Sequence, residues 1–314
     1  MDNLKKVGLT ALAGSLVVAG HVSAAEMSVS GSATMSYNGG DEDKTEGQGW
    51  TMGDSVTFSA SGDVNDIGVT YSVELDGDAA DGGGGVDSYS LAFDLGDAGS
   101  LTFAGHGGDG FMSANDDVMP TAHEEPWDVV TSAETQLING HSGNNMFNYK
   151  YSHESGLNLT VGYLNAADAV TDVSYTDYGV TYTGMEGLTL GYGQGDVEQT
   201  TNTKSDESTM FAKYAIGAVT VGIQMSEKDN ESGNDYETTG VGISYQVNDD
   251  LAVSYGSHIT EVDGSSPDQE ASAVSVSYTM GSLSMSLSMH QVDNINNVAT
   301  NDREAYNVSL GFAF

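Results

Sequence analysis

Acidic side chains gather in one stretch of the chain, residues 107–144. Carboxylates held close together attract cations, and they avoid mutual repulsion by taking up protons or by sharing a divalent ion. We expect Asp116, Asp117 and Glu124 to be the candidate ligands for calcium, and the alternative is a set of solvated acids without metal. The acids of this stretch are Asp109, Asp116, Asp117, Glu124, Glu125, Asp128 and Glu134.

The spacing of the histidines and serines does not indicate nucleophilic catalysis. A nucleophile needs a base within hydrogen-bond reach, and a third group must orient that base. His106, His258 and His290 fall in separate alternating segments, with no such arrangement around any of them. The glycine-rich "DGGGG" lacks the lysine and the following helix of a phosphate-binding loop. We therefore predict that the protein is not an enzyme.

The remaining sequence is organised by alternation of apolar and polar residues. In "GSLSMSLSMHQV", residues 281–292, the apolar residues Leu283, Met285, Leu287 and Met289 alternate with serines. A period of two indicates a β-strand with one apolar and one polar face. About sixteen such strands are expected. They begin near Met27, Met52, Ile67, Val86, Gly99, Asn145, Leu157, Val173, Leu188, Ser208, Ala218, Tyr236, Leu251, Ala271, Leu283 and Glu304.

The connections between these strands alternate in length. Tight ones such as "HESG" and "VNDD" take turns with long acidic ones such as "NGGDEDKTEGQG". This order is typical of a transmembrane up-and-down antiparallel β-barrel, whose apolar rows face lipid and whose polar rows line an aqueous lumen. A two-sheet sandwich is disfavoured, because the rows of Ser, Thr, Gly, Asn and Asp could not form its dry core.

Two consequences follow from an all-β barrel in a membrane. The first strand must pair with the last, because hydrocarbon leaves no sheet edge unpaired, and about sixteen strands enclose a water-filled channel. Alternation also sends a small set of charged side chains into the lumen. These inward charges are Glu74, Asp94, Lys150, Asp177, Lys213 and Arg303.

The N-terminus and the net charge indicate the cellular location. Lys5 and Lys6 precede an apolar run and then small residues, which is typical of a secretory signal. We expect residues 1–25 to be removed, with Ala24 as the alternative cleavage point, and residues 26–314 to form one domain. With 46 acidic and 8 basic residues, the net charge of −38 makes nucleic acid a poor partner. The absence of cysteine excludes disulfides.

Four segments of the chain have a recognisable pattern: "AAEMSVSGSATMSY", "GSLTFAGHGG", "NMFNYKYSHESGLNLTVGY" and the terminal "YNVSLGFAF". In these segments the chain resembles the Gram-negative general-diffusion porin family, in its alphaproteobacterial type. The resemblance covers the whole mature chain. Its most specific part is Phe314, which shares a face with Phe312 and Tyr306 and looks like the signal that the barrel assembly machinery reads.

The resemblance implies a homotrimer of sixteen-stranded barrels in the outer membrane, in contact with lipopolysaccharide. It also implies that the third outer loop, residues 107–144, folds into the lumen and narrows it. Family members usually set arginines and lysines against the acids of this loop. Here the only arginine after residue 25 is Arg303, and Lys150 is the expected counterpart of the loop acids.

The function that we expect is passive diffusion of ions and small hydrophilic solutes, with selectivity for cations. Carboxylates inside a pore attract cations and repel anions over about one Debye length, roughly 8 Å at physiological salt. Two alternatives remain open. One is a channel specific for cationic nutrients or divalent ions, and the other is a structural or adhesive barrel.

Overall fold

The computed structural model describes residues 26–41, 49–77, 85–130, 143–165, 173–199 and 203–314. The expected signal sequence and Glu134 lie outside these residues. None of the helices in the described ranges has the length and apolarity needed to cross a bilayer.

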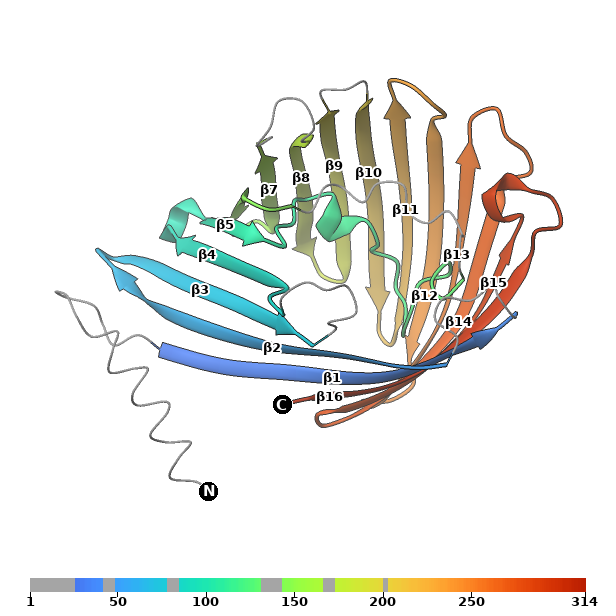
Figure 1. Cartoon of the computed structure of the whole chain (residues 1–314), viewed down its shortest axis with the longest axis horizontal. Helices are drawn as coiled ribbons and strands as arrows, with labels where there is room; N and C mark the ends of the chain where they lie inside the picture. The colour runs from blue at the N-terminus through green and yellow to red at the C-terminus, as the bar shows by residue number, and fades with distance from the viewer. Residues whose placement is uncertain (1–25, 42–48, 78–84, 131–142, 166–172, 200–202) are drawn as a thin grey trace.

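Sixteen antiparallel strands form one closed barrel in which each strand pairs with its neighbours in sequence (Figure 1). The predicted fold class is therefore confirmed. The strands are β1 (Glu26–Gly40), β2 (Gly49–Val64), β3 (Ile67–Asp76), β4 (Ser88–Asp94), β5 (Ser100–His106), β6 (Met146–Ser152), β7 (Leu157–Leu164), β8 (Val173–Met185), β9 (Leu188–Gln199), β10 (Thr203–Ile216), β11 (Val219–Asn230), β12 (Tyr236–Gln246), β13 (Leu251–Val262), β14 (Gln269–Met280), β15 (Leu283–Asp293) and β16 (Arg303–Ala313).

The barrel closes where its first and last strands meet. The backbone N–H of Gly31 donates to the carbonyl of Phe314 at 2.8 Å, and the N–H of Phe314 donates back to Gly31 at 2.9 Å. The pairing continues upward to Gly40, opposite Ala305. The expected pairing of first and last strands is thus confirmed, and no edge is left where β1 meets β16.

Most predicted strand starts agree with the structure, and β10 differs most. It begins at Thr203, five residues before the predicted Ser208, because Thr203 pairs with Gln199 of β9 beyond the apolar part of the hairpin. Polar residues above the membrane still gain the hydrogen bonds of the ladder, so hydrophobic alternation underestimates the length of such strands.

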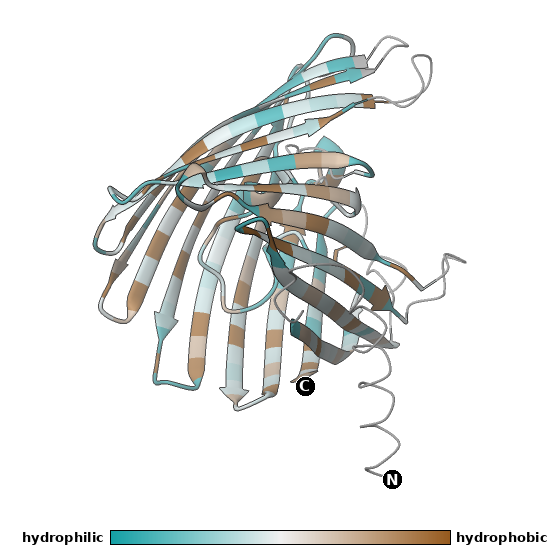
Figure 2. Cartoon of the chain, turned by 90° about the vertical axis from the view of Figure 1, so that its left-hand side faces the viewer, coloured by the Kyte–Doolittle hydropathy of each residue, from teal (hydrophilic) through white to brown (hydrophobic). Residues whose placement is uncertain are grey.

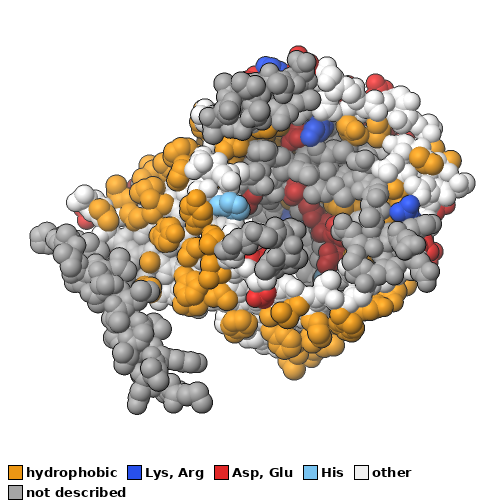
Figure 3. Space-filling view, viewed as in Figure 1, with side chains coloured by type: hydrophobic (Ala, Val, Ile, Leu, Met, Phe, Trp, Pro, Cys, Tyr) orange, Lys and Arg blue, Asp and Glu red, His pale blue; other side chains and the backbone are white. Residues whose placement is uncertain are grey.

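Apolar side chains point outward from the barrel and polar ones point inward. On β15 the outward Leu287 is 42% exposed, whereas the inward Ser288 is fully buried. The alternation appears as bands along the strands in Figure 2, and hydrophobic side chains cover much of the outside in Figure 3. Inside, hydroxyl groups pair across strands, as Ser36 does with Ser309 and Ser59 with Ser72, both at 2.9 Å. An apolar exterior of this extent fits lipid as its surroundings.

This polarity predicts effects of different size for the same substitution at neighbouring positions of β15. Leu287→Arg places a charge against lipid and is expected to lower the free energy of unfolding by about 2–4 kcal/mol. Ser286→Arg, the matched control, places the same charge in the aqueous lumen and is expected to change it little. Urea unfolding in phospholipid vesicles measures both, and a larger loss for Ser286→Arg would contradict the assigned polarity.

The inner loop and the pore lining

Residues Gly107–Val130, here called the inner loop, leave the end of β5 and cross the inside of the barrel (Figure 1). Two backbone hydrogen bonds between Gly108 and Gly143, at 3.1 and 3.0 Å, close the base of the loop. The loop contains one short 3₁₀ turn, η3 (Ser113–Asn115). The predicted inward folding of the segment after β5 is therefore confirmed for its described part.

Asp177 on β8 anchors the first turn of the inner loop. Its side chain is fully buried, and its carboxylate accepts hydrogen bonds from the N–H of Met112 at 2.8 Å and the hydroxyl of Tyr175 at 3.3 Å. The prediction that Asp177 is a lumen-facing charge needs correction. Alternation correctly places the Asp177 side chain on the inner face of the sheet. The inner loop covers this side chain, so Asp177 holds the loop instead of facing the solution.

Glycines on the inner face of the wall make room for the loop. A Cβ on Gly193 would lie 2.2 Å from the Phe111 ring, and one on Gly222 would lie 2.6 Å from Pro120 Cδ. Gly179, which pairs with Gly193 across β8 and β9, lies under the same ring, since a Cβ there would be 2.2 Å from Phe111 Cγ. These glycines were not singled out from the sequence. The sequence feature that could have identified them is the presence of glycine at inward positions, where other inward positions carry Ser or Thr.

Polar side chains of the wall fix the loop along its length. On β11, the Gln224 side chain accepts from the N–H of Val118 at 3.1 Å and donates to the carbonyl of Asn115 at 2.8 Å. On β13, Ser254 Oγ accepts from the N–H of Ala122 at 2.8 Å.

The far end of the loop reaches the last strands. His123 Nε2 donates to Asn307 Oδ1 on β16 at 2.8 Å, and His290 Nδ1 on β15 donates to the carbonyl of Pro126 at 3.3 Å. The ring of Trp127 packs against that of His258, with centroids 4.2 Å apart and the ring planes tilted by 58°. The loop therefore lies against β8–β16 and leaves the inner faces of β1–β5 as the open side of the pore.

Four acids of the loop form one cluster. Carboxylate oxygens of Glu124, Glu125 and Asp128 lie within 4.8 Å of one another, and the carboxyl groups of Asp117 and Glu125 are hydrogen-bonded. Burial raises the pKa of Asp117 to about 6, and the negative charges of Asp116 and Asp128 act in the same direction. Burial, followed by the Asp117 charge, raises the pKa of Glu125 far enough to keep it protonated at neutral pH.

The basic residues that lie near the loop acids differ from the one expected. Burial also raises the pKa of Glu124, although the charge of His123, whose Nε2 lies 3.2 Å from Glu124 Oε1, opposes the rise. Lys213 on β10 is the lysine whose charge lowers the pKa of Asp117. The predicted counterpart, Lys150, instead lines a cavity between β1 and β6 near the short turns.

The structure brings together only part of the predicted calcium set. Among the described residues, the three acids close enough to share an ion are Glu124, Glu125 and Asp128, so only Glu124 is common to this group and to the predicted one. Asp116 is near enough to Asp117 to act on its charge. Asp109 is exposed at the start of the loop, where its carbonyl accepts from the Asn148 amide.

The open wall opposite the loop carries hydroxyl groups and acids. Within the described part of β1–β5 there is no lysine or arginine. Glu74 on β3 accepts from Ser88 Oγ at 3.3 Å, and Asp94 on β4 is exposed to the lumen. Arg303, at the start of β16, donates to Asn301 at 3.1 Å. Acidic side chains are visible inside the hollow in Figure 3.

Comparison with known proteins identifies relatives by family and by fold. Residues 8–314 match the family model described as "Gram-negative porin". An anion-selective porin from Comamonas acidovorans has a TM-score of 0.72 at 14% identity, with 92% of this chain and 100% of that chain covered. The trimer form of OmpT, an outer membrane protein of Vibrio cholerae, has a TM-score of 0.70 at 16% identity, with 93% and 100% covered.

A mutant of the porin from Rh. blastica is also similar, with a TM-score of 0.66 at 11% identity and coverage of 92% and 100%. At such identities these structures share the fold with this chain. The comparison with curated proteins gives no match.

The glycine contacts predict that a larger side chain is tolerated at an inward glycine of the barrel wall only where the inner loop does not lie against it. Gly193→Val is expected to push Phe111 and the loop toward the opening, to lower single-channel conductance, and to cost about 1–3 kcal/mol by overpacking. Gly53→Val on β2 is the control, because a Cβ there meets nothing within 4 Å. Planar-bilayer recording and urea unfolding measure the two effects. Equal behaviour of both variants would contradict this seating of the loop.

Proposed function

The chain belongs to the Gram-negative porin family, and from that premise we propose that it forms a water-filled, cation-selective channel for passive diffusion of ions and small hydrophilic solutes. It is a multi-pass β-barrel protein of the outer membrane. The family and the fold also support a channel without enzymatic activity.

The one-sided charge of the pore lining carries the proposal of cation selectivity. The inner loop supplies Asp116, Asp117, Glu124 and Asp128, whereas the described part of the facing strands β1–β5 supplies hydroxyl groups and further acids but no lysine or arginine. A permeating anion passing within a Debye length of these acids is repelled from one side without being attracted from the other. The cluster keeps part of this charge at neutral pH, since Asp117, with its pKa raised only to about 6, is ionised there although Glu125 holds a proton.

Fold alone does not decide the sign of selectivity. The porin from Comamonas acidovorans is described as anion-selective and has a similar barrel. The difference proposed for this chain comes from its own side chains, in particular the scarcity of lysine and arginine that accompanies its net charge of −38.

Selectivity is expected to depend on pH in a defined direction. Because burial raises the pKa of Asp117 to about 6, lowering the pH through 6 protonates this group and removes attraction for cations. The K⁺ over Cl⁻ permeability ratio should therefore fall as the pH is lowered from 8 to 5. The double variant Asp117→Asn/Asp128→Asn should lower the ratio about two- to threefold at pH 8 and flatten its pH dependence.

Reversal potentials in planar bilayers under a KCl gradient measure these ratios. Asp249→Asn, which removes an exposed acid from the short turn between β12 and β13, is the control and should leave the ratio unchanged. A reversal potential that favours chloride at pH 8 would refute the proposed selectivity.

The two alternative functions give different recordings. A channel specific for cationic nutrients would show conductance that saturates with solute, whereas a general porin passes small solutes in proportion to concentration. A structural or adhesive barrel would leave the bilayer electrically silent.

Calcium is a second proposal, now placed on Glu124, Glu125 and Asp128. Three carboxylates within 4.8 Å of one another offer the oxygen ligands that calcium prefers, and binding would displace the proton of Glu125. Calcium should therefore raise the thermal midpoint of the wild type, more at pH 8 than at pH 5. The variant Glu124→Gln/Asp128→Asn should lose most of this rise, and an equal rise in both proteins would exclude the site.

Self-association is supported by the outer face of β2. Asp54 lies between the outward Met52 and Val56, where a carboxylate facing hydrocarbon is unfavourable, and Met52 is 69% exposed. A partner subunit over this face would cover both residues, and OmpT of Vibrio cholerae is described in a trimer form. We propose a homotrimer, which light scattering on detergent-solubilised protein would distinguish from a monomer.

Two further partners remain proposals. Tyr306, Phe312 and Phe314 face outward on the last strand, as expected for a terminal signal to the barrel assembly machinery. Deleting Phe314 should slow insertion by that machinery. Lipopolysaccharide would contact the outer half of the apolar exterior, and co-purification of lipopolysaccharide with the detergent-solubilised protein tests this contact.

A further inference from the structure

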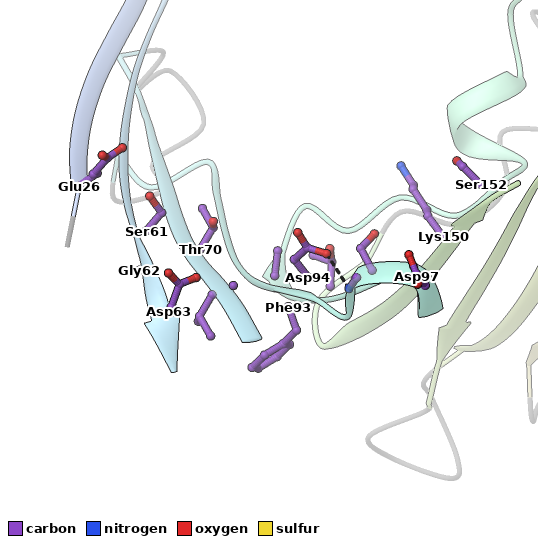
Figure 4. A pocket seen from close by; sticks show the side chains of 17 residues that line it. Glu26, Ser61, Gly62, Asp63, Thr70, Phe93, Asp94, Asp97, Lys150 and Ser152 are labelled. Atoms are coloured by element: carbon purple, nitrogen blue, oxygen red, sulfur yellow. Dashed lines mark hydrogen bonds between the residues drawn. The ribbon is translucent and has the colours of Figure 1, made fainter. Parts of the chain in front are cut away.

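A cavity inside the barrel, at the end with short turns, lies outside the inner loop described above. It has a volume of about 1010 Å³ and is lined by residues of β1–β6 and of the short turn between β4 and β5 (Figure 4). Glu26 and Asp63 lie on one side, Lys150 lies on the other, and Asp94 lies between them. The cavity therefore combines carboxylates and one ammonium group around a solvent-filled space.

Three charged side chains of the cavity, those of Asp63, Asp94 and Lys150, lie in one row across the sheet. Asp63 pairs in register with Gly68, Gly68 with Asp94, Asp94 with Ser100, and Ser100 with Lys150. Neighbouring strands lie about 4.8 Å apart, so the backbones of Asp94 and Lys150 are roughly 10 Å apart across Ser100. Small residues between the charges keep the surface open, and the heads of Asp94 and Lys150 can approach the same small molecule.

Gly68 forms a notch between two carboxylates. The point where a Cβ on Gly68 would sit lies 3.9 Å from Asp63 Oδ1 and 3.9 Å from Asp94 Oδ2. The other oxygen of Asp94 accepts a hydrogen bond from the N–H of Gly96 at 2.9 Å, which orients the carboxylate. Two acceptor oxygens on either side of an open notch suit an ammonium group, which donates up to three hydrogen bonds.

Lys150 is available to an anion. The ion pairs among the described residues are His123–Glu124, Lys204–Glu198 and Lys228–Glu207, and Lys150 takes part in none of them. Its side chain is exposed to the cavity. Because Lys150 has no ion-pair partner within the described part of the chain, its ammonium group is available to bind a carboxylate.

We propose that this cavity is a binding site for zwitterionic solutes of the α-amino acid class, with preference for those that carry a second cationic group. The ammonium group binds in the Gly68 notch between Asp63 and Asp94, and the carboxylate binds Lys150. A second cationic group is attracted by Glu26 and Asp97, which also line the cavity. The inference rests on the proposed function only in that solutes reach the site through the pore.

The same arrangement disfavours solutes that carry charge of one sign. A dication without a carboxylate leaves Lys150 unpaired and is repelled by it. A dicarboxylate meets Asp63, Asp94 and Asp97 and is repelled by them. Discrimination of this kind arises from adding unfavourable contacts for the wrong solute to favourable contacts for the right one.

Blocking of single-channel current tests the site in the wild-type protein. L-arginine, agmatine, which lacks the carboxylate of arginine, and glutarate are added to the face of the bilayer that carries the short turns. We expect arginine to interrupt the potassium current with an apparent affinity at least fivefold higher than that of agmatine, and glutarate to have no effect. Equal block by arginine and agmatine would overturn the proposal, because attraction to the acids alone would then explain it.

Three variants separate the contacts. Lys150→Met should weaken block by arginine at least fivefold and leave block by agmatine unchanged or stronger. Gly68→Ala keeps every charge but fills the notch, and should weaken block by both solutes. Glu74→Gln removes an inward acid of the same strand outside the cavity, and should leave the arginine affinity as in the wild type.

The unblocked conductance of each variant shows that its barrel is folded. The outcome is also separable from that of the proposed selectivity. A chloride-selective channel that arginine still blocks through Lys150 would refute cation selectivity and support the site. A cation-selective channel in which Lys150→Met leaves the arginine affinity unchanged would overturn the site and leave the proposed function intact.

Discussion

Backbone hydrogen bonding in hydrocarbon is the constraint on which the rest of this structure depends. An N–H or C=O group without a partner costs several kcal/mol in lipid, so every strand must have two neighbours at membrane depth. The mutual bonds between Gly31 and Phe314 meet this demand by closing the sheet. Once the sheet is closed, each strand has only an outside that faces lipid and an inside that faces water.

Closure leaves the inner face free to specialise, and its two halves do so differently. Under the inner loop, inward positions are glycines such as Gly193, or polar side chains such as Gln224 that bind the backbone of the loop. On the uncovered half, inward positions are mainly hydroxyl groups with scattered acids, among them Asp63 and Asp94. The loop therefore sets the position of the opening, and the uncovered wall provides the surface that a solute meets.

The acids of the pore differ in their surroundings, because some are packed inside the loop and others lie on the open wall. Asp117 and Glu125 share a hydrogen bond inside the packed loop, and burial raises the pKa of both. Asp94 is exposed on the open wall, where one of its oxygens is oriented by Gly96. A count of carboxylates thus overstates the fixed charge at the loop, since protons are held between close neighbours there.

The sequence by itself determined the barrel, its polarity and the start of most strands. This was possible because alternation with period two is a local property that can be recognised in each segment separately. Segment 281–292 showed which side of β15 is apolar, and the long acidic stretch after β5 indicated a loop with a special role. Alternation also gave the correct side of the sheet for Asp177 and Lys150. Only the tertiary structure decided what each of them meets there, because contacts between the loop and distant strands follow from barrel curvature and loop path. Asp177 lies buried beneath Met112. Lys150 faces a cavity at the opposite end of the pore from the base of the inner loop. Lys213, and not Lys150, is the lysine whose charge acts on Asp117.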